Sequence, residues 1–124
     1  MDSNKPLVVG GVAGALALWL YARRSGRRGR LDPEDPPKLK YGTAGFRCEA
    51  SLLGVAMERV GMLAAYRSRD RGGKAVGVMV TASHNPVADN GVKIVDPSGA
   101  MLAMDWEAKA EAVAAAPASR LASA

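Results

Sequence analysis

The chain has 124 residues, of which 48% are hydrophobic, and it contains one cysteine. This length can bury one modest hydrophobic core, and a single cysteine excludes both an internal disulfide and a Cys-x-x-Cys metal site. The formal net charge is +5. Residues 1–40 carry eight Lys/Arg against four Asp/Glu, whereas residues 41–124 carry nine against eight, so the basic character belongs to the N-terminal part. Only six aromatic residues are present and none alternates with the arginines, which argues against nucleic-acid binding.

An uncharged run of sixteen residues, 7–22, lies near the start of the chain and is followed by an arginine-rich flank. As a helix rising about 1.5 Å per residue it would be roughly 24 Å long, slightly shorter than a ~30 Å hydrocarbon core. Trp19 and Tyr21 lie where the run meets the arginines, as in the aromatic belts of membrane helices. Residues 1–30 are therefore predicted to form an apolar helix and flank that anchor a cytoplasmic protein to a membrane, with the rest of the chain facing the cytosol.

Three other interpretations of residues 1–30 stay open. A cleaved secretory signal is disfavoured because only Lys5 precedes the apolar run and no small-residue cleavage pattern follows it. An organellar transit peptide would be amphipathic rather than continuously apolar, although the absence of acidic residues between Lys5 and Leu31 agrees with one. The third interpretation is that these residues are upstream sequence wrongly joined to the chain.

The remainder is divided into a linker, one domain and a tail. Residues 31–39 form an acidic, proline-rich linker, because three prolines within five positions prevent a regular helix. The globular domain is expected to span residues 40–116. Residues 117–124 are a low-complexity tail without an apolar period, and an ending of this kind predicts that the sequence is one piece of a longer protein.

Hydrophobic periodicity predicts an α/β order of elements, with a mixed sheet and flanking helices. A short extended segment at 42–47 is followed by an apolar stripe at helical spacing, which predicts a helix over 51–69 with Ser51 as its N-cap. The uncharged residues 75–80 predict a strand buried on both faces. The remaining predicted elements are a turn at Asn90-Gly91, a strand over 92–95 and a helix over 105–115.

The most distinctive stretch is residues 81–86, Thr-Ala-Ser-His-Asn-Pro, directly after the predicted buried strand. Ligands of α/β sheets bind at the carboxyl ends of strands, which is where Ser83 falls. The connector from 81 to 91 is also long, and long ordered connectors in compact domains tend to be functional. A solvent-facing serine at this place can carry out covalent chemistry, whereas a serine making only a local backbone hydrogen bond is the alternative.

Three blocks in a fixed order resemble the α-D-phosphohexomutase family. They are residues 40–47 with Gly-Thr-Ala-Gly-Phe-Arg, residues 81–86, and residues 89–97 with Asp-Asn-Gly-Val-Lys-Ile-Val-Asp-Pro. With residues 101–107 downstream, the similarity runs from about 40 to 113 and is greatest to the branch that acts on N-acetylglucosamine phosphates. The family has four domains around a central cleft, and the resemblance implies that this chain is part of the first.

The resemblance also implies a reaction. Ser83 would rest as phosphoserine, donate its phosphoryl group to a sugar monophosphate, and take the other phosphoryl group back from a bisphosphate intermediate. The substrates would be N-acetylglucosamine 6-phosphate and 1-phosphate, on the route to UDP-N-acetylglucosamine.

Other residues of the blocks receive roles from the same resemblance. His84, whose imidazole suits proton exchange near neutral pH, is a candidate acid/base or phosphate contact, and an exposed loop histidine is the alternative. Lys93 is a candidate for proton transfer or charge stabilisation, and an exposed strand lysine is its alternative. Arg47 is a phosphate contact, because a guanidinium can bind phosphate at two points. Thr43 and Asn85 complete the expected phosphate-binding set.

The expected metal site is incomplete. Family members hold Mg²⁺ on an Asp-Gly-Asp type loop, and no two aspartates of this sequence have that spacing. Asp89 and Asp96 are acids near the serine loop, but both lie in turn sequences and are interpreted as structural residues. Mg²⁺ could therefore contact only the phosphate on Ser83. We expect this chain alone to have no appreciable mutase activity. The alternative function is a membrane-tethered, non-catalytic remnant that acts as a binding or regulatory module.

Overall fold

The computed structural model describes residues 31–123. The predicted apolar helix at 7–22 and its arginine-rich flank lie outside these residues, and no helix inside them is long and apolar enough to cross a membrane. The described elements, in chain order, are β1 (Tyr41–Gly42), β2 (Gly45–Glu49), η1 (Ala50–Leu52), α2 (Gly54–Asp70), β3 (Gly77–Val80), β4 (Asp89–Val95), η2 (Met104–Trp106), α3 (Glu107–Ala115) and α4 (Ala118–Ala122).

The strands form one four-stranded sheet in the order β1-β2-β4-β3, and neighbouring strands run antiparallel. The α/β class is confirmed, but the expected mixed sheet is wrong for this part of the chain. A parallel neighbour needs a crossover of about a dozen residues or more, usually containing a helix. Between β3 and β4 there is only the loop of residues 81–88, so the chain returns beside β3 in the opposite direction.

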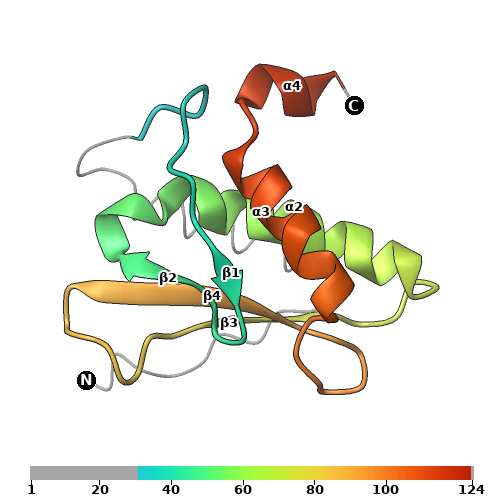
Figure 1. Cartoon of the computed structure of the whole chain (residues 1–124). Coiled ribbons are helices and arrows are strands. Elements are labelled where there is room, and N and C mark those ends of the chain that lie inside the picture. The colour runs from blue at the N-terminus through green and yellow to red at the C-terminus, as the bar shows by residue number, and fades with distance from the viewer. Residues whose placement is uncertain (1–30, 124) are drawn as a thin grey trace.

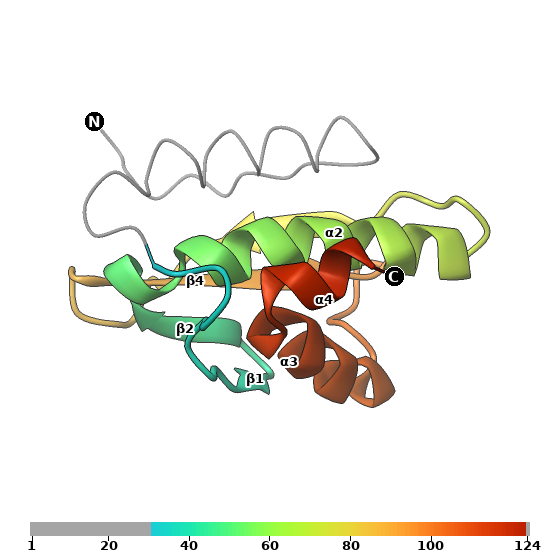
Figure 2. The same ribbon diagram turned by 90° about the horizontal axis from the view of Figure 1, so that it is seen from above.

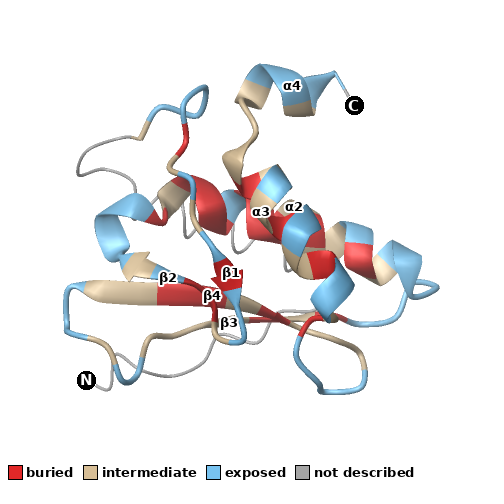
Figure 3. Ribbon diagram, viewed as in Figure 1, coloured by how far each residue is buried: buried red, intermediate tan, exposed pale blue. Residues whose placement is uncertain are grey.

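Helices α2 and α3 cover the same face of this sheet (Figures 1 and 2). Buried residues concentrate between the sheet and these helices (Figure 3). Val78 of β3 is buried there, whereas Gly77 and Met79, which alternate to the other face, are only half-buried. The prediction that this strand is fully buried on both faces is therefore wrong. The fully buried large side chains of the core are Phe46, Leu53, Ile94, Val60 and Val92.

The first helix follows the predicted stripe, since Leu53, Met57 and Val60 are all buried. Its predicted cap is wrong. Ser51 lies in η1, where its hydroxyl donates to Glu49 Oε1 at 2.7 Å, and α2 begins at Gly54 without a side-chain cap. The 3₁₀ turn contains Ser51 and ends before Leu53, the N-cap position of α2, so the serine lies two residues too early to cap this helix.

The predicted low-complexity tail contains the short helix α4. Pro117 stands at its start, after α3 has ended at an extended Ala116 with ψ 141°. The tail lies against the proline-rich linker: the Ala118 amide donates to Pro33 O at 3.0 Å, and Ser119 donates from its amide and hydroxyl to the Glu34 carboxylate at 3.0 and 2.8 Å. The two segments at the ends of the described chain are thus joined to each other.

Candidate active site

The loop of residues 81–88 connects β3 to β4 at one end of the sheet (Figure 1). The Thr81 amide donates to Gly91 O at 3.0 Å, which closes the base of the loop. A turn follows in which the Asn85 amide donates to Ala82 O at 2.9 Å. Ser83 and His84 are the two central residues of this turn, and both side chains are exposed. The fold therefore presents the candidate nucleophile to solvent, as the sequence predicted.

Arg47 reaches the same loop from β2. Its Nη1 donates to Asn85 Oδ1 at 3.1 Å, and Asn85 Nδ2 donates in turn to Asp89 Oδ2 at 3.0 Å. These bonds connect Arg47 of β2, which is 38 residues before Asn85 in sequence, to the Ser83 loop and to the first residue of β4. The structure thus brings the predicted phosphate contacts Arg47 and Asn85 together, two residues after Ser83. Asp89, interpreted from sequence as a structural turn residue, belongs to the same chain of hydrogen bonds.

Gly91 makes this approach feasible. It lies directly opposite Arg47 in the β2·β4 ladder, and a Cβ at this position would be 2.7 Å from Thr81 O and 2.9 Å from Phe46 O. The same Cβ would be 3.5 Å from Arg47 Cγ, so the arginine side chain runs across the glycine. The predicted turn at Asn90-Gly91 is wrong, because both residues pair within β4. A glycine within a strand pattern often marks such a close approach of backbone segments.

Lys93 lies on β4 and Thr43 in the β1–β2 turn, and no hydrogen bond within the described residues joins either side chain to the serine loop. Lys93 follows Gly91 by two residues, so it alternates to the sheet face that also carries Arg47. Thr43 lies in the β1–β2 turn, which packs against β4: a Cβ on Gly45 would be 2.6 Å from Lys93 Cβ. Lys93 and Thr43 line one cavity of about 120 Å³, whose other lining residues are Tyr41, Gly42, Ile94, Met101, Leu102, Met104 and Glu107.

His84 stands apart from these contacts. Within residues 31–123 its imidazole makes no hydrogen bond, and it lies on the exposed turn next to Ser83. Its place suits a contact with a bound anion or a solvent-facing role equally well. The geometry therefore agrees with both interpretations of His84, an acid/base or phosphate contact and an exposed loop histidine.

Two weak acids near the site have raised pKa values. Burial is the main cause for the Cys48 thiol on β2, and the negative charges of Asp89 and Glu49 add to it, so the pKa rises and the neutral thiol is favoured. Burial also raises the pKa of Tyr41, although its hydroxyl oxygen accepts a hydrogen bond from the Ile94 amide at 2.9 Å. The neutral forms of both groups are therefore favoured.

The described residues do not fit a magnesium centre by themselves. No group of three or more His, Cys, Asp or Glu side chains within residues 31–123 could hold a metal ion. Asp89, the acid closest to Ser83 in sequence, already accepts a hydrogen bond from Asn85. A divalent cation at this loop would have to take its other ligands from outside this part of the chain.

Comparisons with known proteins identify the family of this chain. A sequence profile described as phosphoglucomutase/phosphomannomutase, alpha/beta/alpha domain I, matches residues 42–120, which is more than half of the chain. The chain belongs to this family. The match covers every element from β2 to α3 and enters α4. The resemblance to phosphohexomutases predicted from three sequence blocks is confirmed.

Curated relatives narrow the similarity to one branch of the phosphohexomutases. The phosphoacetylglucosamine mutase of Oryza sativa subsp. japonica is 59% identical over 83 residues, which are 67% of this chain and 15% of that protein. The Homo sapiens phosphoacetylglucosamine mutase is 57% identical over 76 residues, 61% of this chain and 14% of that protein. The chain thus spans about 15% of the length of these relatives.

Solved structures of the same branch share the fold. The Aspergillus fumigatus N-acetylphosphoglucosamine mutase in complex with GlcNAc-6P and magnesium superposes with a TM-score of 0.65 at 46% identity, over 83% of this chain and 18% of that one. A serine-to-alanine variant of that enzyme in complex with glucose 1,6-bisphosphate gives a TM-score of 0.66 at 46% identity, over 86% and 19%. The similarity thus holds in sequence and in backbone.

Proposed function

We propose that this chain supplies the phosphoserine element of a phosphoacetylglucosamine mutase, the enzyme that interconverts N-acetylglucosamine 6-phosphate and 1-phosphate. The observation that carries the proposal is the placement of Ser83 on an exposed turn whose next residues are held by Arg47 and Asp89. The relatives' names and the GlcNAc-6P complex of the A. fumigatus enzyme support this sugar.

The proposed chemistry is a pair of phosphoryl transfers. Phosphoserine 83 gives its phosphoryl group to a free hydroxyl of the sugar monophosphate. The new bond joins phosphorus to the sugar oxygen, the bond to Ser83 Oγ breaks, and the proton of the sugar hydroxyl passes to the Ser83 oxygen. The resulting bisphosphate then returns its other phosphoryl group to Ser83. Such transfers depend on positioning and on positive charge around the moving oxygens. Arg47 and Lys93 supply positive charge, and His84 exchanges the proton.

Thr43 and Asn85 are proposed to contact phosphate oxygens around this centre. Mg²⁺ would be held here only through the phosphate on Ser83, as the sequence predicted, and its remaining ligands would come from outside the described residues. When bound, such an ion would neutralise phosphate charge. The residues of this chain would still orient the serine and bind the phosphate.

The proposal is tested by incubating the intact chain with glucose 1,6-bisphosphate and mapping the added phosphoryl group by mass spectrometry. We expect Ser83 to become phosphorylated and Ser83→Ala to remain unmodified. Ser98→Ala is the matched control, because Ser98 is also an exposed loop serine and should not affect the result. Phosphorylation that persists in Ser83→Ala, or an unmodified wild-type chain, would count against the proposal and in favour of the non-catalytic module.

A second measurement addresses the complete reaction. We expect the 124-residue chain to take up the phosphoryl group without converting N-acetylglucosamine 6-phosphate to the 1-phosphate, because it spans about 15% of its relatives. Turnover by the purified chain would contradict this.

The predicted anchor at residues 7–22 and the cytosolic location are tested by cell fractionation with and without residues 1–30. An unchanged distribution between membrane and soluble fractions would contradict the anchor.

A further inference from the structure

We propose that Asp89 is a positioning residue for the phosphoryl transfer, acting on Arg47 through the side-chain amide of Asn85. This inference rests on the proposed function for its consequence in catalysis. It adds a residue that the sequence had assigned only to a turn. The juxtaposition that carries it is the hydrogen-bonded series from Asp89 to Asn85 to Arg47.

The chemistry of the carboxylate fixes the orientation of the amide. An ionised carboxylate only accepts hydrogen bonds, so Asn85 must direct its NH₂ group toward Asp89 Oδ2, at 3.0 Å. The amide oxygen then points the other way and accepts from Arg47 Nη1 at 3.1 Å. With the amide reversed, its NH₂ would oppose the guanidinium, which also only donates. Asp89 therefore orients the Asn85 amide so that its oxygen, and not its NH₂ group, faces Arg47.

The backbone holds Asp89 firmly enough for this task. As the first residue of β4 it pairs with Glu49 of β2, and its amide donates to Pro86 O at 2.9 Å. The residue before it is fixed as well, since Ala88 O accepts from the Ala50 amide at 2.9 Å. The loop side chain of Asn85 is thus held from β4 on one side and from β2 on the other.

The consequence is a pre-oriented arginine. Arg47 is exposed, and a long exposed side chain samples many rotamers unless something holds its end. Asn85 holds the guanidinium beside the turn that carries Ser83, so less ordering is needed when a phosphoryl group arrives. Within the described residues no hydrogen bond joins Asp89 to Ser83, and the proposed effect of Asp89 on the reaction passes through Asn85.

The test compares initial rates of Ser83 phosphorylation by glucose 1,6-bisphosphate in the intact chain. Asp89→Ala and Asn85→Ala should each lower the rate about tenfold. The double variant should be no slower than Asn85→Ala, because both changes break one series of contacts. Asp89→Asn should keep most of the activity, since its amide oxygen can still accept from Asn85. Glu49→Ala is the matched control. It removes the acidic side chain opposite Asp89 in the β2·β4 ladder but leaves Asn85 untouched, so its phosphorylation rate should match that of the wild type.

A second readout does not require phosphoryl transfer. In ¹⁵N-labelled protein the side-chain NH₂ signals of Asn85 and the Nε–H signal of Arg47 should shift in Asp89→Ala and remain in place in Glu49→Ala. Equal rates for Asp89→Ala and the wild type, multiplied losses in the double variant, or an equal loss from Glu49→Ala would overturn the assignment. If the wild type takes up no phosphoryl group, the proposed function fails, and the spectra of Asp89→Ala alone test the positioning role. Unchanged Asn85 and Arg47 signals in this variant overturn that role, and shifted signals support it.

Discussion

Gly45 and Gly91 allow separate backbone segments to approach β4 more closely than a side chain would permit. A Cβ on Gly45 would be 2.2 Å from Val92 O, and this glycine also has a φ of +76°, a value that other residues rarely adopt. A Cβ on Gly91 would overlap two backbone oxygens. At the residue scale, the absence of a Cβ at Gly45 and Gly91 therefore shapes the site as much as the charged side chains do.

Gly91→Ala should destabilise the protein and displace the Ser83 loop. The added methyl meets Thr81 O and Phe46 O, which are backbone atoms and cannot rotate away, so we expect a loss of about 2 kcal/mol. Gly54→Ala is the control, because a Cβ there meets nothing within 4 Å and alanine favours helix. Chemical denaturation measures both. A Gly91→Ala variant as stable as the wild type would show that the strands can move apart easily.

Individual residues of the site differ in how far sequence could locate them. The exposed loop position of Ser83 was predictable, because a serine in a distinctive motif after an apolar strand is a local signal. Asp89 was assigned to a turn, since its partner Asn85 is recognisable only when the loop has folded back. Gly91 carried a usable signal, a glycine within a strand pattern, but the neighbouring Asn favoured the turn interpretation.

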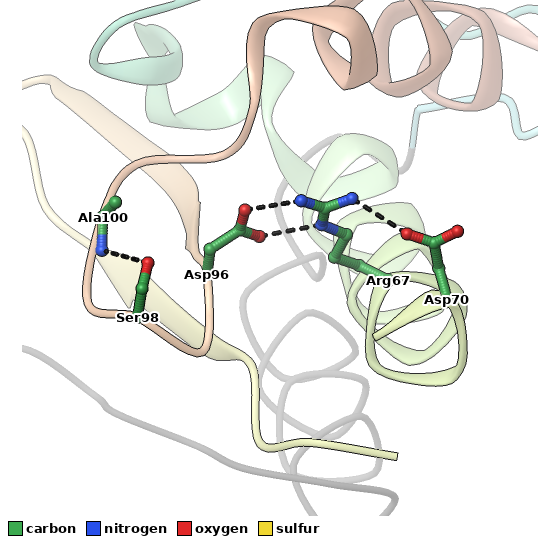
Figure 4. A network of polar contacts seen from close by, with 5 residues as sticks. All are labelled: Arg67, Asp70, Asp96, Ser98 and Ala100. Atoms are coloured by element: carbon green, nitrogen blue, oxygen red, sulfur yellow. Dashed lines mark hydrogen bonds and ion pairs between the residues drawn. The ribbon is translucent and has the colours of Figure 1, made fainter. Parts of the chain in front are cut away.

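At the scale of elements, Arg67 joins α2 to the end of β4. Its Nε and Nη2 donate to the two carboxylate oxygens of Asp96 at 2.9 and 2.6 Å, and its Nη1 donates to Asp70 Oδ2 at 3.0 Å (Figure 4). The guanidinium carbon also lies 4.8 Å from the centre of the Trp106 ring. The Arg67 and Asp96 side chains are 6% and 11% exposed, so this two-point pair is largely removed from water.

Asp96→Asn should cost about 3 kcal/mol of stability, because it leaves the buried Arg67 without its main partner. Asp70→Asn is the control: Asp70 is 50% exposed, and its loss should cost less than about 1 kcal/mol. Denaturation midpoints of the two variants at neutral pH test the difference. Equal losses would mean that the Asp96 contact contributes no more than a surface ion pair.

The same contact predicts a dependence on acid. The hydrogen bond from Arg67 lowers the pKa of Asp96 against the opposing effect of burial, so the folded pKa lies below the unfolded one. The resulting stabilisation is present above the unfolded value of about 4 and is lost as the pH falls through the folded value. Stability measured from pH 5 to pH 2 should therefore fall more steeply in the wild type than in Asp96→Asn. Parallel curves would contradict the coupling.

Helix α2 shows why some elements could be predicted and their contacts could not. Its apolar stripe is a local repeat and is visible in the sequence. Arg59 and Arg67 lie on the buried side as well, one helical step of four residues on either side of the buried Leu63. Charged residues on an apolar stripe can be buried only when acceptors come from elsewhere in the chain. These acceptors are Asp96, directly after β4, and carbonyl oxygens at the end of α3.

At the scale of the whole molecule, Arg59 forms hydrogen bonds to segments near both ends of the described chain. Its guanidinium donates to the carbonyl oxygens of Val113, Ala114 and Ala116 at the end of α3, and to Pro33 O at 2.9 Å. Burial is the main reason that its pKa is lowered. Backbone carbonyls at a helix C-terminus carry partial negative charge and suit a cation.

Arg59→Lys should destabilise the protein by about 2 kcal/mol, because one ammonium group cannot reach carbonyls on both segments in a planar fork. The loss should appear locally as faster amide hydrogen exchange in residues 31–35 and 113–122. Arg69→Lys, at an exposed site on the same helix, should change stability by less than about 0.5 kcal/mol. Unchanged exchange at both ends in Arg59→Lys would show that other contacts hold the segments together.

The sequence by itself determined the family, the α/β class, the first helix and the loop position of the candidate nucleophile Ser83, because each depends on residues that are neighbours or that repeat at a short period. The tertiary structure decided that the described sheet is antiparallel, that hydrogen bonds join Arg47 to Asn85 and Asn85 to Asp89, and that the tail forms a helix against the linker. These features depend on partners between 4 and 85 positions apart, and a hydrogen bond has no local pattern until the backbone has brought donor and acceptor within about 3 Å.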